Sequence, residues 1–307
     1  MSSSLVGRAW LWAAEKPRLE RFAKHSRLTR RVVDRFISGG DLEDAVKVIK
    51  DLNERHIGGI LDLLGEGVTD PAGAEAAFEA YLAAVKRIAE TGIDTTVSLK
   101  LTQLGLAFDK GSCIDHLRKL AAEAQAAGAG LEIDMEQSDY VEDTLDIFRL
   151  MHTDYPTLRL ALQSYLRRTP ADLESMAELR PRVRLVKGAY AEHTDIAFHK
   201  RSEIDAQYRY LTRWLFEKGT DPAIATHDEE LISHARKLAG EQPSGNKSFE
   251  VQMLYGIRRD LQNELARTGH RVRVYVPYGS AWYPYLMRRI AERPANLRFF
   301  LRALVGK

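Results

Sequence analysis

From about residue 57 onward, short apolar segments alternate with longer amphipathic segments. The short ones have the length and alternating pattern of β-strands, and the long ones have the apolar spacing of helices that bury one face. We predict strands at Gly59–Leu64, Thr96–Leu101, Leu131–Met135, Leu158–Gln163, Val183–Lys187, Pro222–Thr226, Ser248–Leu254 and Arg271–Val276. We predict helices at Ala72–Thr91, Ile114–Ala127, Val141–Met151, Ala171–Leu179, Ile204–Lys218, Asp228–Ala239, Arg258–Arg267, Trp282–Glu292 and Ala295–Val305.

Three further helical patterns precede the first strand, at Leu5–Ala14, Pro17–Phe36 and Asp41–His56, and Asp41 is placed to cap the third. We therefore divide the chain into an N-terminal helical segment, residues 1–56, and a second domain, residues 57–307. Strands separated by helices pair in parallel through crossover connections, which predicts an α/β fold. The second domain has the length of a (β/α)8 barrel, about 250 residues. An open doubly wound sheet is the alternative, but the G-x-G-x-x-G loop that usually accompanies it is absent.

Several predicted strands carry polar side chains on one face. One face of residues 130–136 presents Glu132, Asp134 and Glu136, and Arg184 shares a face with Val186 in its strand. Similar faces hold Ser98, Lys100 and Thr102, and Ala161 with Gln163. The interior of a closed barrel excludes water, so unpaired ions there would be costly. The pattern predicts a cavity that binds a polar ligand.

Composition narrows the class of protein. The chain has 307 residues, of which 45% are hydrophobic and 29% charged, and a net charge of +2 does not indicate nucleic-acid binding. A single cysteine, Cys113, excludes an intrachain disulfide and suits a reducing compartment. No apolar run reaches the length of a membrane span, and residues 1–14 lack the ordered regions of a signal peptide. We expect a cytoplasmic protein.

Polar residues also mark the ends of most predicted strands, where active sites of barrels lie. These residues are Asp62, Lys100, Asp134, Glu136, Gln163, Lys187, His227, Gln252 and Tyr275. For any one of them, a helix cap or a buried ion pair is the simpler interpretation. For the whole set, one ligand contacted from many sides is simpler.

The turn after the fifth predicted strand could bind a phosphate. Lys187 is followed by Gly188, Ala189 and Tyr190, so backbone N–H groups could approach an anion that the lysine neutralises. The same lysine could form a Schiff base. Its position alternates with that of Arg184, however, so its side chain should point away from the barrel axis, which weakens the Schiff-base interpretation.

The sixth predicted strand carries small side chains on its inner face. Ala223 and Ala225 leave room for a flat ring system, and His227 follows them as a base, a metal ligand or a hydrogen-bond donor. The other histidines show no paired spacing at strand ends, so we expect no metal site.

The helix predicted after the eighth strand has the most specific pattern. Tyr285, Arg288, Arg289 and Glu292 lie on one helical face. Adjacent arginines usually mark a solvated surface, but two guanidinium groups can also bind one small carboxylate in a bidentate manner. A second basic stretch, residues 18–35, is interleaved with apolar residues. It indicates an amphipathic helix with a solvated cationic face, and docking on an anionic membrane is the alternative.

Five segments together resemble the flavin-dependent proline dehydrogenases, in the bacterial form without a fused aldehyde dehydrogenase domain. They are Ser98–Gly105 (SLKLTQLG), Arg184–Tyr190 (RLVKGAY), Ala225–His227 (ATH), Phe249–Gly256 (FEVQMLYG) and Tyr285–Glu292 (YLMRRIAE). The resemblance runs in order from about Ile57 to the C-terminus. It implies a distorted (β/α)8 TIM barrel that binds FAD non-covalently and oxidises L-proline to Δ1-pyrroline-5-carboxylate, passing electrons to a membrane quinone.

The resemblance also implies roles for individual residues. The substrate carboxylate would bind Lys100, Arg288 and Arg289, with Asp134 beside Lys100 and Arg184 near the flavin as the catalytic pair. Tyr275, Tyr285 and Leu254 would pack on the pyrrolidine ring. FAD would be held by Met135, Gln163, Arg184, Lys187, Gly188, Ala189, Tyr190, Thr226, His227, Gln252 and Glu292.

Two other functions remain open on the residues alone. One is a Schiff-base lyase that uses Lys187 or Lys100. The other is a non-catalytic partner-binding protein that uses the basic helix, although this leaves the polar strand ends unexplained. Among relatives, enzymes that prefer hydroxyproline are a nearby possibility, and the bulky Tyr275 argues for proline.

Overall fold

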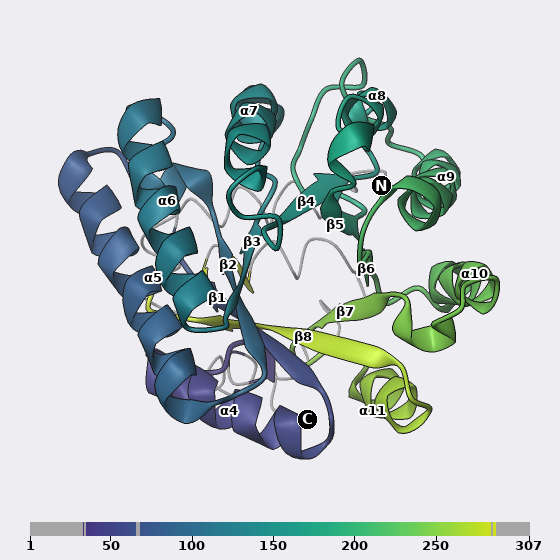
Figure 1. Cartoon of the computed structure of the whole chain (residues 1–307), viewed down its shortest axis with the longest axis horizontal. Helices are drawn as coiled ribbons and strands as arrows, with labels where there is room; N and C mark the ends of the chain where they lie inside the picture. The colour runs from purple at the N-terminus through teal and green to yellow at the C-terminus, as the bar shows by residue number, and fades with distance from the viewer. Residues whose placement is uncertain (1–32, 34, 66–67, 284, 287–307) are drawn as a thin grey trace, which may run out of the picture.

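Eight parallel strands close into a barrel in a computed structural model that describes residues 33, 35–65, 68–283 and 285–286 (Figure 1). The strands are β1 (Gly58–Leu63), β2 (Thr95–Leu99), β3 (Gly130–Ile133), β4 (Arg159–Gln163), β5 (Arg182–Val186), β6 (Ala223–Ala225), β7 (Glu250–Leu254) and β8 (Arg271–Tyr278). Each strand pairs with its neighbours in the chain, and β8 closes the barrel against β1. The predicted (β/α)8 barrel is confirmed.

Helices form a ring around the strands, as Figure 1 shows. They are α4 (Leu42–Glu54), α5 (Pro71–Thr91), α6 (Lys110–Ala126), α7 (Val141–His152), α8 (Thr169–Glu174), α9 (Arg201–Lys218), α10 (Glu229–Gly240) and α11 (Arg259–Arg267). Short 3-10 helices lie at Leu101–Leu104, Ser138–Tyr140, Ala177–Leu179 and Gly245–Lys247. The apolar faces of the long helices pack on the outward faces of the strands, which together form the main core.

Helix α4 covers the outer face of the barrel beside β1 and β8. As predicted, Asp41 caps it by accepting a hydrogen bond from the Asp44 N–H at 2.9 Å. Its buried face includes Ile49, which lies so close to β1 that a Cβ on Gly59 would come within 2.7 Å of the isoleucine side chain. Glycine at this position lets the helix approach the barrel.

Some element boundaries differ from the prediction. The second strand ends at Leu99 because Leu101–Leu104 turns into a 3-10 helix. The helix predicted at residues 171–179 is divided into α8, which ends at Glu174, and the 3-10 helix Ala177–Leu179. At the break, the Ser175 hydroxyl donates to the Asp172 carbonyl, a local bond that competes with a continuous helix. The helices predicted at Leu5–Ala14 and Ala295–Val305 lie outside the described residues, as do most of Pro17–Phe36 and Trp282–Glu292; residues 282, 283, 285 and 286 are helical.

The lower half of the barrel interior, toward the strand N-termini, contains ion pairs. Arg159 donates to Glu250 at 3.0 Å and to Asp221 at 2.7 Å, and Arg273 donates to Glu250 at 3.2 Å. Asp221 also accepts from Arg182 and Arg271. We call these six residues the floor network. In this half of the barrel, inward polar residues pair with one another and do not form the ligand cavity that the sequence pattern suggested.

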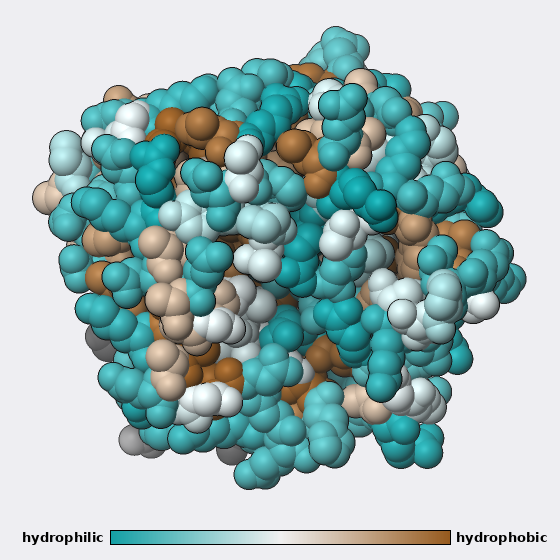
Figure 2. Space-filling view, viewed as in Figure 1, coloured by the Kyte–Doolittle hydropathy of each residue, from teal (hydrophilic) through white to brown (hydrophobic). Residues whose placement is uncertain are grey.

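The face of the molecule seen in Figure 2 is mainly hydrophilic, and the hydrophobic residues on it are interrupted by hydrophilic ones. No helix in the described part of the chain is long and apolar enough to span a membrane.

Candidate active site at the C-terminal ends of the strands

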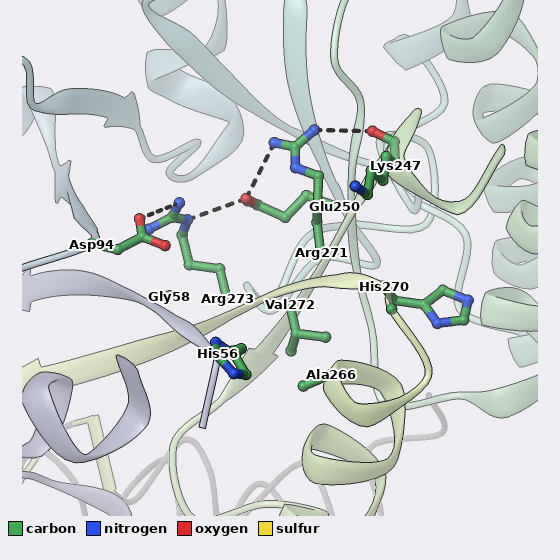
Figure 3. A pocket seen from close by; sticks show the side chains of 11 residues that line it. His56, Gly58, Asp94, Lys247, Glu250, Ala266, His270, Arg271, Val272 and Arg273 are labelled. Carbon is green, nitrogen blue, oxygen red and sulfur yellow. Dashed lines mark hydrogen bonds and ion pairs between the residues drawn. The ribbon is translucent and has the colours of Figure 1, made fainter. Parts of the chain in front are cut away.

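A pocket of 310 Å³ lies at the N-terminal end of the barrel, opposite the strand ends where barrel sites are expected (Figure 3). Its lining includes Glu250, Arg271 and Arg273 of the floor network, together with Asp94. The guanidinium of Arg273 binds Asp94 at 2.9 Å on one side and Glu250 on the other. Because these charges are already paired, the chemistry is better sought at the opposite end.

At that opposite end, Asp134 is the centre of a buried polar cluster. One of its oxygens accepts hydrogen bonds from Ser98 Oγ at 2.7 Å and from Arg184 Nη1 at 2.6 Å. The other accepts from Lys100 Nζ at 3.2 Å and from the Tyr275 hydroxyl at 2.7 Å. Burial alone would raise the pKa of Asp134, but Lys100, Arg184 and the hydroxyl donors hold it well below its usual range. Asp134 is therefore anionic and fixes the groups around it.

Lys100 lies between two carboxylates. Its ammonium group donates to Asp62 at 3.0 Å as well as to Asp134, and only 12% of its side chain is exposed. Burial would lower the pKa of Lys100, yet the neighbouring carboxylates raise it well above its usual value. Asp62 is almost fully buried, and this burial raises its pKa. The lysine thus stays a cation at the end of β2.

Arg184 points into the barrel from β5, as strand alternation predicts. Besides its bond to Asp134, it donates through Nε and Nη2 to Glu132 Oε2 at 2.9 and 2.5 Å. Nη2 also lies 3.0 Å from Ser98 Oγ, and the guanidinium carbon lies 5.4 Å from the centre of the Tyr275 ring. The arginine is 4% exposed, so its contacts set its orientation.

Two glutamines, Gln163 at the end of β4 and Gln252 in the middle of β7, have unused acceptor atoms. Gln163 Nε2 donates to the carbonyls of Met135 and Glu136 at 3.2 and 2.8 Å. Gln252 Nε2 donates to Glu132 and to Glu250. In both residues Oε1 is buried and has no hydrogen-bond partner among the described residues. Each glutamine therefore offers an acceptor to a ligand with an N–H or O–H group.

Lys187, in the turn after β5, does not belong to the cluster around Asp134. Lys187 points to the outside, where its ammonium group donates to Asp205 of α9 at 2.5 Å and to Asp228 at 3.1 Å. Gly188 follows with a φ of +111°, and a Cβ there would come within 2.1 Å of the Tyr165 ring. Only glycine fits this turn. Ala189 and Tyr190 continue the loop.

His227 and Thr226 lie at the end of β6. His227 Nε2 accepts a hydrogen bond from the Leu254 N–H at 2.9 Å, so the proton of the neutral ring is on Nδ1. Thr226 Oγ1 accepts from the Asp228 N–H at 3.1 Å. Across the described ranges, no three His, Cys, Asp or Glu residues lie close enough together to hold a metal ion.

The structure brings four of the predicted site residues into direct contact: Lys100, Asp134, Arg184 and Tyr275. Lys187 lies apart from these four residues. Tyr285 is described and buried. The remaining residues of its predicted helix face lie outside the described residues: Arg288, Arg289 and Glu292. The predicted site list did not contain three residues that the cluster includes: Asp62, Ser98 and Glu132. The sequence pattern could have identified them, because Ser98 and Glu132 share a strand face with Lys100 and Asp134, and Asp62 lies near a strand end.

Comparisons with known proteins identify relatives. A family model described as proline dehydrogenase matches residues 45–302. Proline dehydrogenase 1 of Bacillus subtilis is 38% identical over 303 residues, covering 99% of this chain and all of its own. Proline dehydrogenase of Deinococcus radiodurans is 36% identical over 310 residues, covering 99% of both chains.

Solved structures of larger proteins share the fold. Proline utilization A (PutA) from Bdellovibrio bacteriovorus superposes with a TM-score of 0.81 at 24% identity over 89% of this chain. A PutA variant from Bradyrhizobium japonicum gives a TM-score of 0.73 at 26% identity over 90% of this chain. The chain spans only about a third of the length of these structures (33% and 32%).

Replacing Lys100 by methionine should strongly destabilise the fold, because it leaves Asp62 and Asp134 buried without their shared cation. We expect the free energy of unfolding to fall by about 3–5 kcal/mol. Lys110 is a matched control, since it also binds two carboxylates, at 2.6 and 3.4 Å, but on the surface. Lys110→Met should cost at most about 1 kcal/mol. Urea unfolding measures both, and equal losses would contradict the description of a buried cluster.

Proposed function

The chain belongs to the proline dehydrogenase family, and on this premise we propose that it oxidises L-proline to Δ1-pyrroline-5-carboxylate, with FAD as a non-covalent hydride acceptor and a membrane quinone as the final electron acceptor. The enzyme is a proline dehydrogenase, which catalyses the first step of proline catabolism. The observation that carries the proposal is the buried cluster of Lys100, Asp134, Arg184 and Tyr275 at the strand ends, beside unused glutamine acceptors.

The residues at the barrel mouth fit a flavin. An isoalloxazine ring presents both N–H and carbonyl groups along one edge. Gln163 Oε1 and Gln252 Oε1 are buried acceptors with no donor among the described residues, and Arg184 and Gln252 bind the same carboxylate, that of Glu132. The small side chains of Ala223 and Ala225 leave room for a flat ring. These features support FAD as the ligand.

The remaining cofactor contacts follow from the family resemblance. We propose that FAD is held by Met135, Gln163, Arg184, Lys187, Gly188, Ala189, Tyr190, Thr226, His227, Gln252 and Glu292. Lys187 would bind the pyrophosphate through its ammonium group. This group also lies within 3.1 Å of Asp205 and Asp228, so it would have to contact the phosphate and these carboxylates together.

The substrate would be bound as a zwitterion. We assign its carboxylate to Lys100, Arg288 and Arg289, because a persistently charged lysine is a good partner for an anion. Asp134 orients Lys100, and Tyr275, Tyr285 and Leu254 surround the pyrrolidine ring. FAD, when bound, supplies the hydride acceptor that no side chain provides. The protein contributes orientation and exclusion of water.

The ion pairs also argue against a Schiff-base lyase. A lysine must be neutral to attack a carbonyl, whereas the two carboxylates beside Lys100 raise its pKa well above the usual value. Lys187 binds two carboxylates of its own outside the barrel. Neither lysine is poised as a nucleophile.

Electron transfer to a quinone requires contact with a membrane. We propose that this contact is peripheral, with the enzyme on the cytoplasmic side; a solvated face is the simpler interpretation of the basic stretch at residues 18–35, and docking through it is the alternative. Of these residues, only Val33 and Arg35 are described. Electrostatic docking of this kind needs anionic lipid and weakens with salt.

We expect the purified protein to contain FAD that acid releases into solution, and to convert L-proline into Δ1-pyrroline-5-carboxylate when a quinone analogue is supplied. Chromatography of the released flavin and mass spectrometry of the product make both measurements. Colour that stays with the precipitate would disprove non-covalent binding. Recovery of FMN, or absence of the product, would disprove the cofactor or the reaction.

Arg289→Lys should raise the proline concentration for half-saturation by well over tenfold, with FAD content and folding unchanged. Lysine cannot make two parallel hydrogen bonds to one carboxylate, and losing one partner of a desolvated charge pair costs about 2–5 kcal/mol. Arg267→Lys, at an exposed site at the end of α11, is the control and should leave the kinetics unaltered. Steady-state kinetics of both variants provide the measurement. Near-normal kinetics of Arg289→Lys would rule out the binding of the substrate carboxylate by this arginine.

A further inference from the structure

Glu132 connects the floor network to the candidate active site. It lies on the inner face of β3, two residues before Asp134, and is 1% exposed. Its carboxylate accepts hydrogen bonds from Thr96 Oγ1 at 2.9 Å, from Arg184 and from Gln252, and Arg159 of the floor network lies 3.8 Å away. No ligand contact is assigned to this residue.

Toward Arg184, Glu132 fixes the plane of a guanidinium group. Arg184 donates to Glu132 through Nε and Nη2 and to Asp134 through Nη1, so carboxylates hold it on two sides. A planar group held this way has little freedom to rotate. The position of the arginine therefore depends on Glu132 as much as on Asp134.

Toward Gln252, Glu132 fixes the orientation of the carboxamide. Gln252 Nε2 lies 3.2 and 3.3 Å from the two oxygens of Glu132 and 2.8 Å from Glu250 Oε1. Ionised carboxylates only accept hydrogen bonds, so the amide nitrogen must face them. Oε1 is left buried, with no partner in the described structure.

We propose that Glu132 is a positioning residue of the cofactor site, which holds the guanidinium of Arg184 and turns the carboxamide of Gln252 so that one donor and one acceptor face the flavin. The proposal rests on the proposed function, because it takes the ligand of these two groups to be the cofactor.

Glu132 remains charged under all working conditions. Burial would raise its pKa, but Arg184 and Arg159 lower it to about 2. A neutral glutamine in its place would present an N–H group to Arg184 or to Gln252, which already donate. If this N–H group faces Gln252, the Gln252 amide must rotate; if it faces Arg184, the arginine loses the two hydrogen bonds that it donates to Glu132.

The first test is Glu132→Gln in the flavin-loaded enzyme. We expect the rate of flavin reduction at saturating proline to fall at least tenfold, the proline concentration for half-saturation to change less than threefold, and the visible flavin bands to shift. Asp221→Asn is the matched control: it also removes a carboxylate shared by several arginines, of which Arg159 is buried, but it contacts neither Arg184 nor Gln252. It should lower Tm and leave both the reduction rate and the flavin bands unchanged. Equal kinetic effects of the two variants would overturn the proposal.

A double-mutant cycle tests whether Glu132 acts through Arg184. In an Arg184→Ala background, the Glu132→Gln change should lower the rate of flavin reduction by a clearly smaller factor than in the wild-type enzyme, because only its effect through Gln252 remains. Rate losses that multiply would overturn the proposal. If Glu132→Gln does not fold, Glu132→Asp, which keeps the charge but shortens the reach, takes its place in the same cycle.

Thermal unfolding separates this proposal from the proposed function. The Tm loss caused by Glu132→Gln should be at least halved in the Arg184→Ala background, with or without flavin. Protein that binds no flavin but shows this coupling would refute the proposed function and keep the Glu132–Arg184 contact. Additive Tm losses would refute the contact, whatever the cofactor.

Discussion

Inside a closed barrel, every charged side chain needs an opposite charge within reach, because water cannot solvate it there. This chain meets the requirement with a column of alternating charges. The column runs from Asp221 at the floor through Arg159 and Glu132 to Arg184 and Asp134. At its upper end Lys100 joins Asp134 to Asp62. Each member contacts the next, and Glu132 is the member at which the floor network meets the active-site groups.

The same column explains how a site can be polar and still rigid. Buried ion pairs contribute little net stability, but removing one partner is expensive because the other stays charged in a dry interior. Such pairs therefore resist rearrangement and keep donors and acceptors where a ligand meets them. In the upper part of the column, unused acceptors on Gln163 and Gln252 lie near the charged groups. In the lower part the charges are paired with one another, which leaves the chemistry to the strand ends.

Strand alternation was enough to predict much of this arrangement. It placed Arg184 inside and Lys187 outside, and it identified the strand ends that carry Lys100 and Asp134. Gln252, which was also predicted at a strand end, lies in the middle of β7. It could not predict which charges pair, since the contact between Arg159 and Glu250 joins residues 91 positions apart across the barrel. That pairing depends on register and barrel closure, which leave no local pattern. The 3-10 helix that begins at Leu101 was missed for a different reason: its short local pattern fits either a strand or a 3-10 helix.

The central claim is that these strand-end groups present L-proline to a bound flavin. The most direct measurement is anaerobic stopped-flow absorbance of the purified protein, mixed with L-proline or with pyrrolidine, which lacks the carboxylate. The account predicts flavin bands that L-proline bleaches within a turnover time and that pyrrolidine, at the same concentration, leaves almost unchanged. Flavin bands that L-proline does not bleach, or equal bleaching by pyrrolidine, would contradict it.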